Sequence, residues 1–247
     1  MFPILDSFVA KRQAPVTCSI CLVILFAYLC QPSVEQSEQL VALIRQYAVS
    51  PRVYTDNEFY RLTSHIFLHC GPVHLVLNLW AIWFFGRRLE QESGAWKVLT
   101  VFFVSAWVGG LGYALVEIVR GGTAIGSSAG AFGLAAAYFL SFPDRQIWGL
   151  VLLVPMKITA RMWFFVILAV SLMGSALPSN GVAYVAHLGG IVAAFALDVA
   201  VSLSPTGSDW RGMKELLVAE SQDGARRETE FLESNELYRV SRIASRA

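Results

Sequence analysis

A few polar residues lie within long apolar stretches of this sequence, and their types could together carry out one reaction. They are His74, Asn78, the Gly126-Ser127-Ser128 segment and His187. Polar groups inside apolar spans are costly and usually mark a functional site. A serine can attack at neutral pH only if a base takes its proton, and histidine is the natural base. Serine, histidine and hydrogen-bond donors for an oxyanion are the parts that acyl transfer requires.

The local spacing of these residues suits such roles. His74 and Asn78 are four residues apart, so they share one face of a helix and can present two donors to a single oxygen. Ser128 is predicted to begin a helix, where unpaired backbone N–H groups and the helix dipole favour a developing negative charge. Gly126 carries no side chain and leaves room for the backbone of a substrate.

Each of these motifs also has a purely structural explanation. Gly-x-Ser in an apolar helix fits the small-residue contacts that helices make in lipid, and His187 alone fits a hydrogen bond between helices. Ser127 is a rival nucleophile beside Ser128.

Two further patterns suggest metal or redox chemistry. His65, His69 and His74 are spaced by four and five residues, but their stretch offers no carboxylate or fourth ligand. Cys18-x-x-Cys21 has the spacing of a redox or metal pair, although helix packing explains a membrane-buried pair more simply. We therefore predict no metal and no cofactor.

The distribution of charge indicates a membrane protein. Of 247 residues 55% are hydrophobic and 15% are charged, whereas an average soluble domain is roughly a quarter charged. Arg61 is followed by no charged residue until Arg87, and Arg161 by none until Asp198. Such runs match the roughly 20 apolar residues that cross a bilayer. The net charge is +1 and there is no basic stripe, so we expect no nucleic-acid partner.

These runs predict an all-α, polytopic membrane protein with six spanning helices. The predicted spans are 14–30, 69–86, 98–119, 128–142, 162–177 and 182–203. Residues 39–47 are predicted to form a surface or interfacial helix, 147–156 an interfacial connection, and 210–217 a small amphipathic helix. The domains are then a cytoplasmic N-terminus (1–13), a membrane domain (14–203) and a polar cytoplasmic tail (204–247).

The Lys and Arg residues of the short loops predict that both termini are cytoplasmic and that the loop 31–60 faces outward. The second, fourth and sixth helices then enter from the outer face. Asn78 and His187 each lie about two turns into their helices, roughly 10 Å below that face, and Ser128 enters from the same side. Three separate polar sites therefore converge at one depth.

Together these residues resemble the rhomboid family of intramembrane serine proteases. The resemblance covers residues 55–200 and includes Tyr60–His69, His74-x-x-x-Asn78, Gly86–Glu90, Gly126-x-Ser128 with Phe132-Gly133, Phe142-Pro143, Pro155–Lys157 and Ala186-His187-x-x-Gly190. It implies a six-helix rhomboid-like bundle with a Ser-His dyad and no third acidic member.

By position in these motifs, the resemblance implies Ser128 as nucleophile and His187 as general base. His74, Asn78 and the Ser128 backbone N–H would form the oxyanion hole, and Phe132 would stack on the His187 ring.

Gly126 and Gly190 would support the dyad. Two residues depart from the family pattern, because Ala129 and Ala194 stand where glycine is usual.

The resemblance implies an intramembrane serine endopeptidase that cleaves transmembrane protein substrates. The alternative is a rhomboid-like pseudoprotease that binds membrane clients without cleaving them. The expected partners are transmembrane protein substrates and the lipid bilayer, in a multi-pass arrangement that we assign to a bacterial inner membrane. The sequence indicates no oligomeric state.

Overall fold

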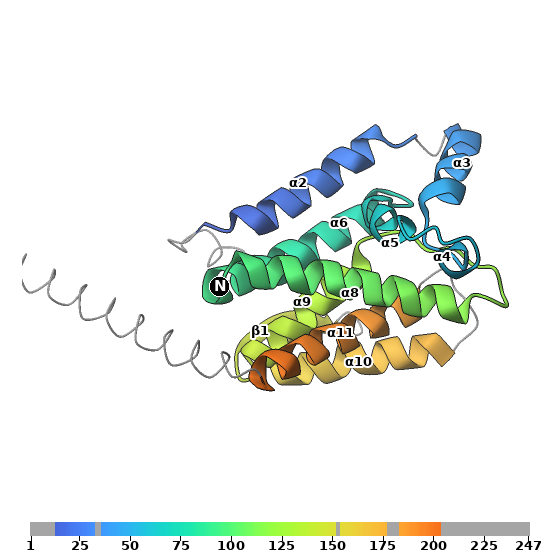
Figure 1. Ribbon diagram of the computed structural model, residues 1–247. Coiled ribbons are helices and arrows are strands. Elements are labelled where there is room, and N and C mark those ends of the chain that lie inside the picture. Colours follow the sequence, from blue (N-terminus) through green and yellow to red (C-terminus); the bar gives the residue numbers. More distant parts are fainter. Residues whose placement is uncertain (1–12, 33–35, 152–153, 177–182, 204–247) are drawn as a thin grey trace, which may run out of the picture. The chain divides into compact units, whose positions relative to one another are not determined.

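The structure, a computed structural model, describes residues 13–32, 36–151, 154–176 and 183–203 (Figure 1). Residues 1–198 and 199–247 form two units, and the architecture below is that of the first. The predicted tail, including its amphipathic helix at 210–217, and nearly all of the predicted N-terminal segment lie outside the described residues.

The described chain is mostly helical, and each of the six apolar segments predicted as spans contains a helix. In chain order the helices are α2 (Pro15–Cys30), α3 (Ser37–Tyr47), α4 (Arg52–Thr55), α5 (Arg61–Ser64), the 3-10 helix η2 (His65–Phe67), α6 (Pro72–Ala81), the π-helix η3 (Ile82–Gly86), α7 (Arg87–Ser93), α8 (Ala95–Val116), α9 (Ser128–Ser141), α10 (Ala160–Ala176) and α11 (Tyr184–Leu203). The helix predicted over 39–47 is confirmed as α3.

Length and composition identify the helices that are candidates to cross a membrane. Among the described residues, Ala95–Val116 and Tyr184–Val201 are long and apolar enough to do so. The pair Arg61–Phe67 and Pro72–Ser93, bent by 104°, is a third candidate if it counts as one broken span. The other apolar helices, α2, α9 and α10, are shorter.

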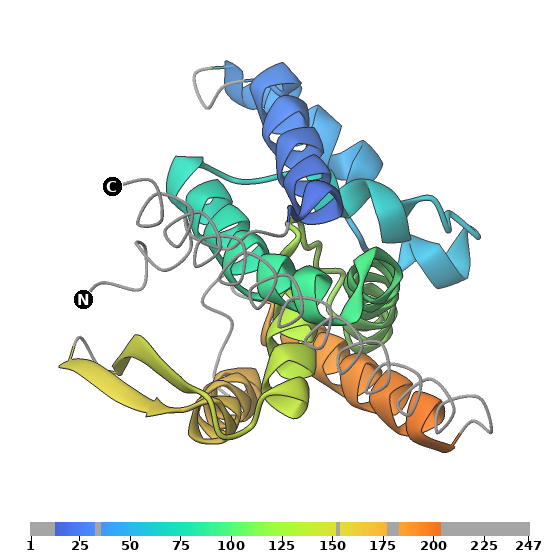
Figure 2. The same cartoon turned by 90° about the vertical axis from the view of Figure 1, so that its left-hand side faces the viewer.

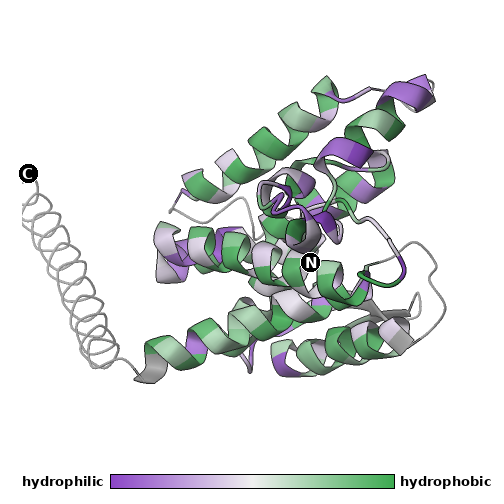
Figure 3. Ribbon diagram, turned by 45° about the vertical axis from the view of Figure 1, so that its right-hand side comes forward, coloured by the Kyte–Doolittle hydropathy of each residue, from purple (hydrophilic) through white to green (hydrophobic). Residues whose placement is uncertain are grey.

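Apolar side chains also cover outward-facing helix surfaces. Figure 3 shows mostly hydrophobic residues along α2, α8, α10 and α11, with hydrophilic residues gathered on the connection that contains α3 to α5. On α6 the large side chains Val73, Val76, Leu77 and Trp80 are between 57% and 72% exposed. Such a continuous apolar surface suits a lipid environment rather than water.

Helix α9 is the most enclosed helix, and it packs against α8, α10, α6 and η3 (Figure 1). Its buried residues are Ala129, Gly130, Ala131, Gly133, Leu134, Ala135, Ala136, Ala137, Tyr138 and Phe139. Most of them are alanine or glycine, which let neighbouring helix backbones approach closely.

A buried carboxylate joins α7 to the beginning of α2. Glu90 accepts hydrogen bonds from the backbone N–H of Val16 at 3.0 Å, and from the N–H and hydroxyl of Thr17 at 2.8 and 2.7 Å. The first N–H groups of a helix have no partner inside the helix and favour negative charge. Glu90 therefore caps α2 and holds it beside the rest of the unit.

A two-stranded antiparallel hairpin connects α9 to α10, with strands β1 (Gln146–Val151) and β2 (Val154–Thr159). It is the yellow element at the lower left of Figure 2. Gln146 pairs with Thr159 and Trp148 with Lys157. We predicted a connection here, but the all-α description needs correction, because both sides of this connection are extended and satisfy each other's backbone groups.

Candidate active site

Ser128 and His187 meet across two helices. Ser128 is the first residue of α9 and is half-buried, whereas His187 is buried in α11. The Nε2 atom of His187 lies 2.9 Å from the Oγ atom of Ser128, which is within hydrogen-bond distance. The two residues predicted as nucleophile and base are thus adjacent although 59 residues separate them.

Aromatic rings hold the imidazole of His187. Phe132, one turn after Ser128, stacks on the ring with centroids 4.1 Å apart and planes 8° apart. Tyr184 approaches at 6.0 Å, edge to face. The Nδ1 atom of His187 is buried and has no hydrogen-bond partner within the described part of the chain. The ring is therefore oriented by stacking rather than by a carboxylate.

His74 lies against the segment that leads into Ser128. A Cβ atom built on Gly126 would lie 2.7 Å from Cε1 and 2.8 Å from Nε2 of His74, so a side chain at residue 126 would displace the ring from this position. The buried side chain of Asn78 donates to the carbonyl of His74 at 2.9 Å. His74 and Asn78 thus lie together on α6, as their spacing predicted.

The backbone conformation at residue 126 also favours glycine. The φ angle of Gly126 is +115°, a conformation that residues with a side chain rarely adopt. Its N–H donates to the carbonyl of His65 at 2.8 Å. This bond and the backbone turn set the direction from which the chain enters α9.

Ser127 faces a different histidine. Its Oγ atom lies 3.4 Å from Nε2 of His69, and both side chains are completely buried. The backbone of His69 is held on both sides by Gln31, which donates to its carbonyl at 2.6 Å and accepts from its N–H at 3.3 Å. The sequence did not predict this second Ser-His pair.

Cys70 is another contact that the sequence reasoning missed. Its exposed thiol sulfur lies 3.2 Å from Nδ1 of His74. The four-residue spacing between Cys70 and His74 could have indicated this contact. Because Cys70 lies before α6, which begins at Pro72, helical spacing did not predict it.

Two side chains from the patterns considered for metal binding bond to backbone carbonyls instead. Nδ1 of His65 bonds to the carbonyl of Arg61 at 2.8 Å, inside its own turn. The thiol of Cys21 lies 3.9 Å from the carbonyl of Leu79 on the neighbouring helix. In the part of the chain that the structure describes, no three His, Cys, Asp or Glu side chains could hold a metal ion.

The departure at Ala129 fits the surrounding backbone. Ala129 lies in α9, and Asn57 is the one non-glycine residue with a positive φ in the described ranges. The methyl group of Ala129 faces α8, where a Cβ built on Gly109 would come within 2.7 Å of it. Gly190 of α11 also packs directly on the backbone of Ala129. Ala194 is likewise buried in the core.

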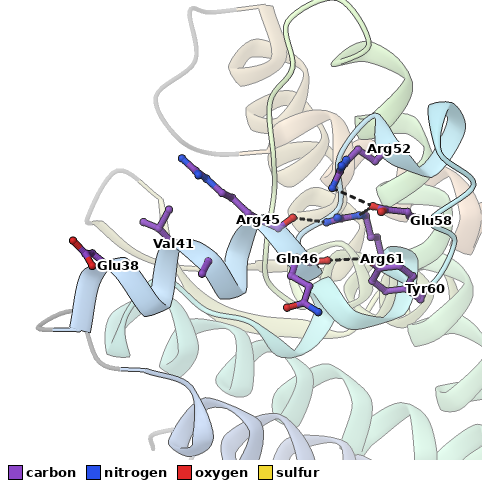
Figure 4. Close-up of a pocket in the computed structure, with 9 residues that line it drawn as sticks. Glu38, Val41, Arg45, Gln46, Arg52, Glu58, Tyr60 and Arg61 are labelled. Carbon is purple, nitrogen blue, oxygen red and sulfur yellow. Dashed lines mark hydrogen bonds and ion pairs between the residues drawn. The ribbon is translucent and has the colours of Figure 1, made fainter.

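An open pocket of about 550 Å³ lies elsewhere, beside α3, α4 and α5 (Figure 4). The buried guanidinium of Arg61 pairs with Glu58 there and donates to the carbonyls of Arg45 and Ala48 at 3.0 and 2.8 Å. Arg52 also pairs with Glu58, at 3.7 Å. Arg52 pairs with Asp56 as well, at 3.0 Å, so each of these two guanidinium groups has a carboxylate partner. We therefore interpret the pocket as part of the packing of the 31–60 connection rather than as a reaction site.

The chain is also similar in sequence to known proteins. A family model described as "Rhomboid domain" matches residues 56–204. The chain belongs to the rhomboid family. It is 29% identical over 180 residues to RHOMBOID-like protein 6, mitochondrial, of Arabidopsis thaliana, covering 73% of this chain and 54% of that protein.

Other rhomboid relatives differ in what their names say of activity. Rhomboid-like protease 3 of Toxoplasma gondii is 33% identical over 102 residues, which are 41% of this chain and 37% of that protein. Inactive RHOMBOID-like protein 8 of A. thaliana is 31% identical over 131 residues, 53% of this chain and 35% of that protein. The chain spans about half the length of the curated relatives that it matches over most of its own length.

Proposed function

We propose that this rhomboid is an intramembrane serine endopeptidase that cleaves transmembrane protein substrates in or near their spanning segments. The observation that carries the proposal is the 2.9 Å contact between His187 Nε2 and Ser128 Oγ. A nucleophile and base within hydrogen-bond reach, with the base held by a third group, is the arrangement that nucleophilic catalysis needs.

In this mechanism Ser128 Oγ attacks the carbonyl carbon of the scissile peptide while His187 Nε2 takes the hydroxyl proton. The C–N bond then breaks, and His187 returns that proton to the leaving amine, which leaves an acyl ester on Ser128. Water attacks the ester next, giving a proton to the same nitrogen. The bond between the acyl carbon and Ser128 Oγ then breaks, His187 returns that proton to Oγ, and the second product leaves with a carboxyl group. The face of the Phe132 ring also stabilises the positive charge that develops on His187, since a cation is attracted to an aromatic face.

The negative charge of the tetrahedral intermediate needs donors near Ser128. The Ser128 N–H belongs to the first turn of α9, where N–H groups have no partner inside the helix. We assign the other donors to His74, whose ring touches Gly126, and to Asn78 one turn further along α6. Removing one such donor typically costs about 10²–10³ in rate.

The length of α9 supports a nucleophile below the membrane surface. Its 14 residues extend about 21 Å at 1.5 Å per residue, which is shorter than a hydrocarbon core of roughly 30 Å. If the cytoplasmic end of α9 lies near the membrane surface, Ser128 lies well inside the membrane and water must reach it from the outer face.

We further propose six membrane-crossing helices, with both termini cytoplasmic, a membrane domain over 14–203 and a cytoplasmic tail over 204–247. The partners are then the bilayer and the transmembrane segments of substrates, with no cofactor. The bacterial inner membrane stays a prediction, and the relatives compared above come from A. thaliana and T. gondii.

The decisive experiment uses the full chain in detergent micelles or proteoliposomes with a model transmembrane substrate. The wild-type protein should cleave the substrate and be labelled by a fluorophosphonate probe. Ser128→Ala should lose both, with cleavage near background. Full cleavage by Ser128→Ala would show that the assigned mechanism is wrong.

A second function, binding membrane clients without cleavage, is supported by the relative whose name calls it inactive. It predicts that the wild-type protein captures a transmembrane client but shows neither cleavage nor labelling. A capture assay run beside the labelling assay separates the two functions.

A further inference from the structure

We propose that Cys70 is a positioning residue that holds His74 in the protonation state required of an oxyanion donor. This inference rests on the proposed protease function. His74 can donate to an oxyanion only from a ring nitrogen that carries hydrogen and points to the reaction site. Of the two ring nitrogens, Nε2 lies closer to Gly126, which is two residues before Ser128, so we assign the donor role to Nε2.

The thiol decides which nitrogen of His74 carries the hydrogen. A neutral imidazole has one donor and one acceptor nitrogen, and the hydrogen bond made by one nitrogen sets the role of the other. Cys70 Sγ lies 3.2 Å from Nδ1. When the thiol donates to Nδ1, the ring hydrogen must reside on Nε2. A proton transfer from sulfur to Nδ1 leaves Nε2 protonated as well.

The backbone around Cys70 is held in place, so that the thiol stays beside Nδ1 of His74. The preceding residue, His69, is bonded through both its N–H and its carbonyl to the side chain of Gln31, the residue that follows α2. Two residues later Pro72 begins α6. Cys70 is thus held between a clamped residue and a helix start, with its sulfur directed at His74.

The test compares Cys70→Ala, Cys70→Ser and Cys30→Ala with wild type, using the model-substrate assay. Cys30 is a second exposed, free cysteine, on α2, and serves as the matched control. Cys70→Ala should lower kcat about three- to tenfold, the size expected for one lost hydrogen bond, with KM unchanged. Cys70→Ser keeps a donor and should retain most of the rate, and Cys30→Ala should equal wild type.

A thiol reagent tests the S–H donor without a mutation, whereas the rate of Cys70→Ser and the split between kcat and KM are the readouts that a merely structural role would not move. Methyl methanethiosulfonate transfers its methylthio group to the sulfur, releases methanesulfinate and removes the S–H donor. It should slow wild type and Cys30→Ala as much as Cys70→Ala is slowed, leave Cys70→Ser unaffected, and be reversed by dithiothreitol.

The outcomes separate this inference from the proposed function. If cleavage depends on Ser128 but is unchanged in Cys70→Ala and after methylthiolation, only the role of Cys70 is overturned and the proposed function stands. Equal slowing of Cys70→Ser and Cys70→Ala would also overturn the role of Cys70. A wild-type protein that neither cleaves nor labels would overturn both. Asn78→Ala is assayed in parallel, and its fall in kcat gives the size of effect expected when a direct oxyanion donor is removed.

Discussion

Two adjacent serines in this rhomboid each face a histidine, and the two pairs differ in almost every other respect. Ser128 and His187 are 2.9 Å apart, and Ser128 is half-buried at the start of α9. Ser127 and His69 are 3.4 Å apart and completely enclosed. Of these two serines, only Ser128 has a side chain that is not completely buried.

The pairs also differ in how the imidazole is held. His187 lies flat against Phe132, which leaves its Nε2 edge free to exchange a proton with Ser128. His69 is held through its backbone by Gln31. The comparison teaches that a Ser-His contact alone does not define a catalytic site. Access to the hydroxyl and orientation of the ring distinguish the proposed site from a structural pair.

The largest expected difference between the pairs comes from replacing each histidine with glutamine. His187→Gln removes the base and should lower kcat by at least about 10⁴-fold. His69→Gln should keep most of the activity of whatever protein remains folded. Steady-state kinetics, normalised to the folded fraction, measure both. Equal losses of kcat in the two variants would show that the two Ser-His pairs do not differ in this way.

A smaller effect is expected from loosening the ring of His187. Phe132→Leu keeps an apolar side chain but removes the stacked aromatic face. Aromatic contacts of this kind contribute about 0.5–1.5 kcal/mol, so kcat should fall about two- to tenfold. The effect should appear in kcat rather than KM, because the ring does not serve to bind substrate. A wild-type rate would show that stacking is dispensable.

The smallest effect on activity is expected from Ser127→Ala. This change leaves a buried nitrogen of His69 without its partner, which costs about 1–3 kcal/mol of stability. The midpoint of thermal unfolding should therefore fall, whereas kcat at a temperature where the variant is folded should stay within about twofold of wild type. Loss of fluorophosphonate labelling in Ser127→Ala would identify it as the nucleophile instead.

Much of the fold was predictable because apolar runs and helix-ending residues are local signals. The helix predicted over 128–142 is observed as Ser128–Ser141, and that over 98–119 as Ala95–Val116. The contact between Ser128 and His187 was predicted from depth and family resemblance, since both residues lie near the same end of their helices.

Other features depend on which elements become neighbours, and local patterns do not carry that information. Glu90 belongs to α7, yet it caps α2, which lies more than 70 residues earlier. No turn motif in the sequence predicted the pairing of Trp148 with Lys157. The bond from Ser127 to His69 likewise requires the position of α9 relative to the 68–71 connection.

The close approach of α8, α9 and α11 sets how far this protein tolerates mutation. A Cβ on Gly189 would lie 2.7 Å from Cα of Gly109, and one on Gly190 would lie 3.0 Å from the carbonyl carbon of Ala129. Backbone therefore rests on backbone beneath the dyad, and no side chain is available to absorb an added methyl group. A mutant library should accept varied apolar residues at exposed positions such as Val73 and Val76, but should recover almost no active clones changed at these glycines.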